Sequence, residues 1–239
     1  MKTILVPTDF SECSVQGLEF SAYLAGKIKA EIHIFNAAET SNYMYSQDQL
    51  AIAPPAAILM EGIKENLRKA SEARLASLKK RSFLKGLKVI TACDVTTNVH
   101  SSILDYSDKI KSVYIIMGSR GSSNVKKILL GSTAERVVRF SPRPVIVIPG
   151  KVLKPELSSI IFASDFSKEA YGIFPVIKEF AYVFKAKITL LKVNTMDQFS
   201  RSKDDAETMS SFNKSFGGKY ETVIYNDFMK EEGILNYLK

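Results

Sequence analysis

Tryptophan is absent from this sequence of 239 residues, and cysteine and histidine occur only twice each. The two cysteines, Cys13 and Cys93, are too few for a disulfide framework and form no CxxC pair, so we expect reduced thiols. No run of about 18 apolar residues occurs, so no transmembrane helix is expected. The first residues, MKTILVPTDF, lack the apolar core and cleavage site of a signal peptide. We therefore expect a cytoplasmic protein with no membrane partner.

Acidic residues are outnumbered, because the sequence holds 33 Lys and Arg against 25 Asp and Glu and carries a net charge of +8. A positive balance favours anionic ligands but does not choose among them. The basic residues are not interleaved with aromatic ones, and no nucleic-acid-binding motif occurs, so nucleic acid is not an expected partner.

A repeat divides the chain. Residues 4–11 (ILVPTDFS) match residues 160–167 (IIFASDFS), and residues 30–34 (AEIHI) match residues 186–190 (AKITL), with a constant offset of 156 residues and no gap. Such a match predicts a tandem duplication of one unit. We expect a first domain over residues 1–150 and a second over residues 151–239.

Apolar runs alternate with helical patterns in the first copy. Strands are predicted at 3–7, 31–37, 88–92, 113–117 and 144–148, and helices from about residue 12 and at 56–81, 99–109 and 132–140. This alternation predicts an α/β fold with a doubly wound, parallel five-stranded, Rossmann-like sheet. The second copy is incomplete: strands at 188–193 and 222–225 flank a polar stretch, a helix follows from about residue 230, and the last two strands have no counterpart.

A glycine-rich segment follows the fourth predicted strand, with Gly118, Gly121 and Gly131 as its glycines. Gly118 would let the chain turn with positive φ and would keep side chains away from a ligand. Gly131 precedes Ser132 and Thr133 at the start of a helix, where unpaired amides and the helix dipole favour an anion. The spacing fits neither a Walker A loop nor GxGxxG.

Three segments together resemble the nucleotide-binding universal stress proteins. They are Gly118-x2-Gly121-x9-Gly131-Ser132, VPTDFS at 6–11 and SPRPVIVIP at 141–149. The resemblance implies an ATP site, with Mg²⁺ accompanying the nucleotide, in the first copy. Residues implied near the nucleoside are Pro7, Thr8, Asp9 and Ala37. Residues implied near the ribose and phosphates are Met117, Gly118, Gly121, Gly131, Ser132 and Thr133.

Each of these assignments has a structural alternative. Asp9 could end a strand and help to cap a helix, and Gly131 with Ser132 could be a simple helix cap. Cys13 lies near Asp9 in sequence and could sense oxidants, although an inert thiol is the simpler interpretation. Asp165 repeats Asp9 without any glycine loop, so no nucleotide is expected in the second copy.

The leading functional hypothesis is an ATP-binding protein of stress response or signalling that acts through nucleotide-dependent conformation or partner binding. The alternatives are a slow ATP hydrolase on the same scaffold and an interaction module without nucleotide. No catalytic residue is assigned. Universal stress proteins commonly dimerise through the last strand, and residues 144–148 form a predicted edge strand, so a homodimer is expected.

Overall fold

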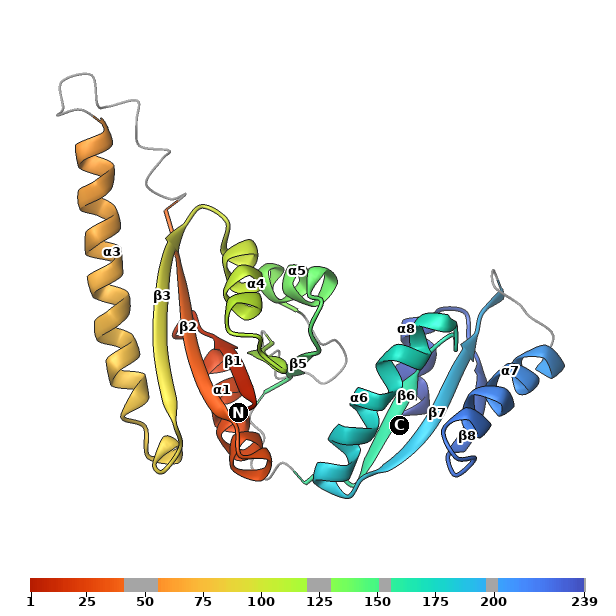
Figure 1. Ribbon diagram of the computed structural model, residues 1–239. Coiled ribbons are helices and arrows are strands. Elements are labelled where there is room, and N and C mark those ends of the chain that lie inside the picture. Colours follow the sequence, from red (N-terminus) through yellow and green to blue (C-terminus); the bar gives the residue numbers. More distant parts are fainter. Residues whose placement is uncertain (41–55, 120–129, 151–155, 197–201, 239) are drawn as a thin grey trace. The chain divides into compact units, whose positions relative to one another are not determined.

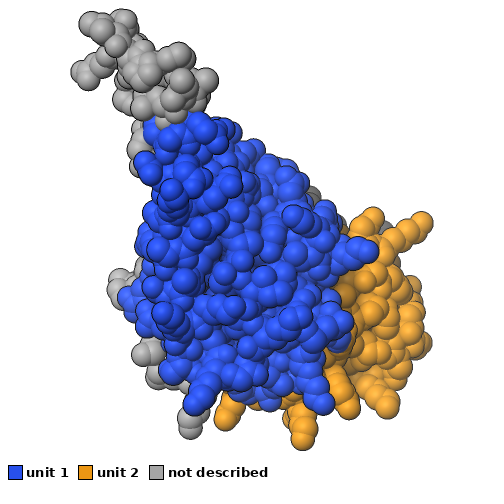
Figure 2. Space-filling view, turned by 60° about the vertical axis from the view of Figure 1, so that its left-hand side comes forward, with its two compact units in different colours: residues 1–155 blue, residues 156–239 orange. Residues whose placement is uncertain are grey.

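The computed structural model describes residues 1–40, 56–119, 130–150, 156–196 and 202–238. The chain divides into two compact units, Met1–Pro155 and Glu156–Lys239, which Figure 2 shows in blue and orange. Within the described ranges, no helix combines the length and the apolar character needed to cross a membrane.

The first unit is built on a five-stranded sheet in the order β3-β2-β1-β4-β5 (Figure 1), and all its strand pairs are parallel. This confirms the predicted doubly wound sheet, and β5 lies at its edge as predicted. The third strand continues four residues beyond its predicted end at residue 92. The strands are β1 (Thr3–Pro7), β2 (Glu31–Glu39), β3 (Val89–Thr96), β4 (Tyr114–Gly118) and β5 (Val145–Ile148).

Helices cover both faces of this sheet. The chain runs from β1 outward to β3, then returns to pair β4 with the other side of β1. Since crossovers between parallel strands are right-handed, this reversal puts the first two helices on one face and the last two on the other. The helices are α1 (Glu12–Ile28), α3 (Ala56–Lys79), α4 (Val99–Lys109) and α5 (Ser132–Phe140), with a short 3₁₀ turn at Ser82–Leu84.

The predicted repeat is present in three dimensions. Helix α6 (Lys168–Phe184) begins and ends 156 residues after α1, and it lies between β6 (Ser159–Ala163) and β7 (Lys187–Asn194). The strand register is also repeated, because Ser159 pairs with Lys187 as Thr3 pairs with Glu31. Both copies thus share the strand, helix and second strand that the sequence match predicts.

The Asp-Phe-Ser turn after the first strand has the same geometry in both units. Phe10 has φ 65° and Phe166 has φ 59°, in a region that bulky residues rarely adopt. In each turn the serine N–H donates to the aspartate carboxylate, at 2.9 Å in Asp9–Ser11 and 3.0 Å in Asp165–Ser167. This bond is what holds the carboxylate at the end of the strand.

The second unit has a three-stranded parallel sheet in the order β6-β7-β8, where β8 is Glu221–Asn226. Helix α8 (Lys230–Tyr237) begins at the predicted residue. The polar stretch, however, contains a helix that the sequence reading missed, α7 (Ser202–Ser215). This helix is mostly solvated and packs through a few side chains such as Met209 and the fully buried Phe212, so its apolar pattern is sparse.

A buried polar pair between the second strand and the following helix differs between the units. In the first unit, the Asn36 side chain donates to the Thr8 carbonyl at 2.7 Å and accepts from the Ser71 hydroxyl at 2.8 Å. In the second unit, Lys192 stands 156 residues after Asn36 and forms an ion pair with Asp205. The same strand position is therefore anchored by an amide in one copy and by a charge pair in the other.

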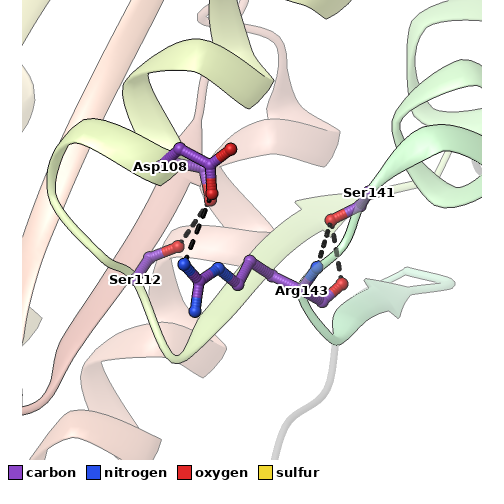
Figure 3. A network of polar contacts seen from close by, with 5 residues as sticks. Asp108, Ser112, Ser141 and Arg143 are labelled. Carbon is purple, nitrogen blue, oxygen red and sulfur yellow. Dashed lines mark hydrogen bonds and ion pairs between the residues drawn. The ribbon is translucent and has the colours of Figure 1, made fainter.

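A polar network ties the C-terminal ends of α4 and α5 together (Figure 3). The Arg143 guanidinium lies 3.3 Å from the Asp108 carboxylate at the end of α4. Ser141, the residue that follows α5, donates to the Arg143 carbonyl and accepts from its N–H. The Ser107 and Ser112 hydroxyls bond each other at 2.7 Å. The network fixes α4 against the segment that leads from α5 into β5.

Candidate functional site

A cavity of about 420 Å³ opens at the carboxyl ends of β1, β2 and β4, beside the first turn of α5. Strands β1 and β4 are the neighbours from which the chain runs in opposite directions across the sheet. Ligands of open α/β sheets bind at such a reversal of strand order. The cavity therefore occupies the position at which this fold class places its ligand.

The predicted site residues meet at this cavity, although they come from four separate segments of the chain. Gly121 lies outside the described residues. The other nine line the cavity: Pro7, Thr8, Asp9, Ala37, Met117, Gly118, Gly131, Ser132 and Thr133. The structure thus brings them together, whereas their role toward a ligand stays a prediction.

Asp9 combines the two roles that the sequence left as alternatives. Its carboxylate accepts the Ser11 N–H, so it is a turn residue, and it also lines the cavity. Partial burial raises the pKa of this carboxyl, but hydrogen bonds from Ser11 and Ser14 lower it more, and the net pKa lies below the ordinary value of 3.8. Asp9 is therefore a fixed anion at neutral pH and a hydrogen-bond acceptor at the cavity wall.

Ala37 belongs to β2, which extends further than the neighbouring strand β1, and it lies two residues past the last paired residue, Phe35. The Phe35 carbonyl accepts the Thr8 N–H, so the backbone groups of Phe35 point toward β1. Because strand backbone groups alternate in direction, the N–H and carbonyl of Ala37 point the same way. The β1–β2 register ends with Pro7 opposite Phe35, so the Ala37 groups face the space beyond β1.

Gly118 is required for a reason that differs from the predicted one. It is not among the glycines with positive φ, so the expected left-handed turn is wrong. A Cβ at this position would instead lie 1.9 Å from the Cys13 carbonyl oxygen in the first turn of α1. Gly17 in α1 meets the same strand, since its Cβ would lie 2.9 Å from the Gly118 nitrogen. Two glycines thus allow α1 to touch the end of β4.

The first turn of α5 faces the cavity without a side-chain cap. Gly131 is the N-cap residue and has φ −64°, so it too needs no left-handed conformation. It has no side chain to accept a hydrogen bond from the helix, and Ser132 and Thr133 follow it at the cavity wall. The first amides of the helix and these hydroxyls are thus available to an anion.

An apolar wall completes the cavity, and the sequence reading missed it. Val99 and Ile103 from the first turns of α4 line the cavity together with Phe35. The Phe35 ring stacks on Tyr106 with centroids 4.4 Å apart and planes 7° apart. Phe35 could have been found from the sequence, since it shares a strand face with Ala37. The α4 residues could not, because their place depends on how α4 packs.

Cys13 also lines the cavity, as do Ser11 and Ser14. The Thr8 and Ser14 hydroxyls bond each other at 2.9 Å, which joins the end of β1 to α1. In the second unit, the described residues include the Asp165 turn but no counterpart of β4 or α5.

The fold defines a doubly wound α/β protein with a cavity at the reversal of strand order. Within that class, the family model of the universal stress protein family matches residues 1–149. The chain belongs to this family.

Two curated relatives come from Methanocaldococcus jannaschii. Universal stress protein MJ0531 is 29% identical over 148 residues, which are 62% of this chain and 81% of that protein. Universal stress protein MJ0577 is 31% identical over 157 residues, covering 63% of this chain and 96% of that protein. Both matches are shorter than this chain.

A crystal structure of a universal stress protein from Archaeoglobus fulgidus resembles nearly the whole chain. It has a TM-score of 0.72 and 22% identity, and the match covers 98% of this chain and 82% of that one. At this identity the likeness concerns the fold, and it extends through both units.

Proposed function

We propose that the first unit binds an adenine nucleotide in the cavity at the carboxyl ends of β1, β2 and β4. ATP is the leading candidate. The observation that carries the proposal is the convergence of nine predicted residues, from four segments, on one cavity of about 420 Å³. A cavity of that size is in the range of small-molecule and cofactor sites.

The lining of the cavity suits both the phosphates and the base of a nucleotide. The uncapped start of α5, with Ser132 and Thr133, offers N–H and O–H donors and a positive dipole end to phosphate oxygens. The apolar side chains of Val99 and Ile103 in the cavity wall would contact the faces of a base. The backbone groups of Ala37 would serve the hydrogen-bonding edge of adenine.

The Asp9 carboxylate fits a neutral part of the ligand. An anion would be repelled by it, whereas ribose hydroxyls would donate to it. The carboxylate therefore favours an orientation with the phosphates at α5 and the ribose near the end of β1. Mg²⁺ would enter with the phosphates, since this ion usually binds through substrate phosphates and water.

At the level of the whole protein, we propose a role in stress response or signalling in which bound nucleotide changes conformation or partner choice. The cavity wall includes residues of α4 and α5, so a bound ligand would contact both helices and could change their positions. A homodimer through the edge strand β5 and a cytoplasmic location belong to the same proposal. Slow ATP hydrolysis remains the second candidate, because positioning and a metal ion can act without a dedicated base.

Calorimetric titration of the full chain with ATP and Mg²⁺ tests the proposal. We expect one saturable site per chain. Asp9→Ala should weaken binding, and Asp165→Ala is its matched control, because it removes the same turn bond in the second unit. If the two variants weaken ATP binding equally, the effect of Asp9→Ala comes from the loss of the turn and not from the loss of a contact with ATP.

The phosphate end needs a variant that does not harm the helix. Ser132→Asp puts a carboxylate in the first turn of α5. The carboxylate interacts favourably with the positive end of the helix dipole but repels phosphate. We expect this variant to be at least as thermally stable as the wild type and to bind ATP at least about tenfold more weakly. Unchanged affinity would contradict the placement of the phosphates at α5.

A further inference from the structure

A hollow of about 360 Å³ lies between α3 and the Asp-Phe-Ser turn of the first unit. Among the described residues, it shares no lining residue with the candidate nucleotide cavity. Phe10 contributes one wall, and the other lining residues come from the last turns of α3 and the position just after it: Ala73, Arg74, Ser77, Leu78 and Arg81. The volume is within the range of small-molecule sites.

Arg74 is held in place by the ring of Phe10. The guanidinium carbon lies 4.0 Å from the centroid of that ring. Such stacking covers a flat face of the guanidinium and leaves the N–H groups at its edge free for an anion. The backbone of Phe10 is itself fixed, because it has φ 65° and its N–H donates to the Thr8 hydroxyl at 2.9 Å. The stack therefore orients Arg74 before any ligand binds.

The positive charge of the hollow is not balanced by an acidic group. Arg81 stands seven residues after Arg74, which is about two helical turns, and lines the same hollow. No carboxylate lines the hollow, and within the described part of the chain neither arginine forms an ion pair. Between Glu72 and Asp94 the sequence contains six basic residues and no acidic one. An anion would relieve the repulsion between the two arginines.

The end of α3 does not cancel this charge. The carbonyls of a last helical turn carry partial negative charge, but those of Ser77 and Leu78 accept the N–H groups of Lys80 and Arg81, at 3.2 and 3.0 Å. The Ser77 hydroxyl donates to the Ala73 carbonyl at 3.1 Å. The two guanidinium groups are therefore the side-chain donors that the hollow offers to a ligand.

The second unit covers the corresponding phenylalanine with apolar rings instead. Phe166 has φ 59° in the same turn, is only 3% exposed and packs on Phe212 of α7 with ring centroids 5.1 Å apart. Phe10, in contrast, is half-buried and lies under a charged group. The turn thus forms without an arginine over its ring, and the open stack is a feature of the first copy alone.

We propose that this hollow binds the phosphate group of a small organic phosphate through Arg74 and Arg81. A guanidinium binds phosphate oxygens through two parallel N–H donors, and a phosphate dianion would balance the two positive charges. Phe10 and Ala73 supply apolar contact for the carbon part of the ligand. The site is separate from the proposed nucleotide site and does not depend on it.

Phenyl phosphate is the probe for the test, because it joins a phosphate monoester to an apolar ring. We expect titration of the full chain, followed by amide NMR at low ionic strength, to give saturable shifts at Phe10, Ser77 and Arg81. The expected dissociation constant is about 1 mM or below, and added salt should weaken binding. Arg74→Gln and Arg81→Gln should each weaken it about fivefold.

Two controls address long-range charge and the nucleotide cavity. Arg68→Gln removes the same charge from the same helix, but Arg68 lines a different hollow, so this variant should leave the affinity unchanged. Ser132→Asp repels phosphate from the start of α5 and should leave the shifts at Phe10 and Ser77 unchanged.

Four outcomes would overturn the site. They are the absence of saturable shifts at the hollow, shifts there that Ser132→Asp abolishes, full affinity in Arg74→Gln and Arg81→Gln, and an equal loss in Arg68→Gln. None of these outcomes involves ATP. A chain that binds phenyl phosphate in the hollow but no nucleotide would therefore refute the proposed function and leave this site standing.

Discussion

Replacing Gly118 with alanine should damage the first unit more than its small size suggests. The added Cβ would lie 1.9 Å from the Cys13 carbonyl oxygen and 2.4 Å from the Cys13 carbonyl carbon. Both are backbone atoms in the first turn of α1, so no change of rotamer relieves the contact. Overpacking of a core costs about 1–3 kcal/mol, and because the partner is rigid backbone we expect a cost of about 3 kcal/mol here. For a chain of this length that is a fall in Tm of about 6–12 °C.

Two glycines of α1 provide the comparison, Gly17 at the same interface and Gly26 away from it. Gly17→Ala brings a Cβ to 2.9 Å from the Gly118 nitrogen, so it should cost less, about 1 kcal/mol. Gly26→Ala meets nothing within 4 Å and should stabilise the helix by about 0.5–1 kcal/mol. Scanning calorimetry measures all three. A Gly118→Ala variant as stable as the wild type would refute the reasoning, as would any other order of the three Tm values.

Three further substitutions probe buried polar groups, each measured by urea unfolding. Ser71→Ala removes the donor to the buried Asn36 side-chain oxygen and should lower the free energy of unfolding by about 1–3 kcal/mol; no loss would contradict the bond. Lys192→Met removes the cation beside the buried Asp205 carboxylate and should cost about 3–5 kcal/mol, most of which the double variant with Asp205→Leu should recover. Burial lowers the pKa of His33 more than the nearby Glu31 carboxylate raises it, so the pKa lies below its ordinary value of 6.5 and the folded state favours the neutral ring. The contribution of the neutral ring to stability is therefore complete above pH 6.5 and declines as the pH falls through the folded pKa. His33→Asn should lack that part of the pH dependence of stability. Identical pH profiles for the variant and the wild type would refute the assignment.

The sequence predicts the framework of the first unit because that framework depends on local patterns. Short apolar runs between helical segments mark the strands of a parallel sheet, and the offset of 156 residues identifies the repeat down to the ends of α6. The site follows from the same logic. Residues at or just beyond the ends of strands, such as Gly118 and Asp9, meet at one edge because parallel strands have their carboxyl ends together.

What the sequence misses depends on packing between distant segments. The need for glycine at position 118 arises from the Cys13 carbonyl, more than a hundred residues earlier in the chain. The apolar wall of Val99 and Ile103 exists because α4 lies over the cavity. Helix α7 has few buried apolar side chains, so its period is hidden among polar residues.

The shared turn gives this protein an internal standard. Asp9 and Asp165 sit in turns with the same hydrogen bond and the same left-handed phenylalanine, within one chain and under one set of solution conditions. A substitution made in both places reports the cost of the turn twice, whereas any ligand contribution is added at Asp9 alone. The part of the difference between the two copies that depends on added ligand therefore reports what the cavity adds to the turn.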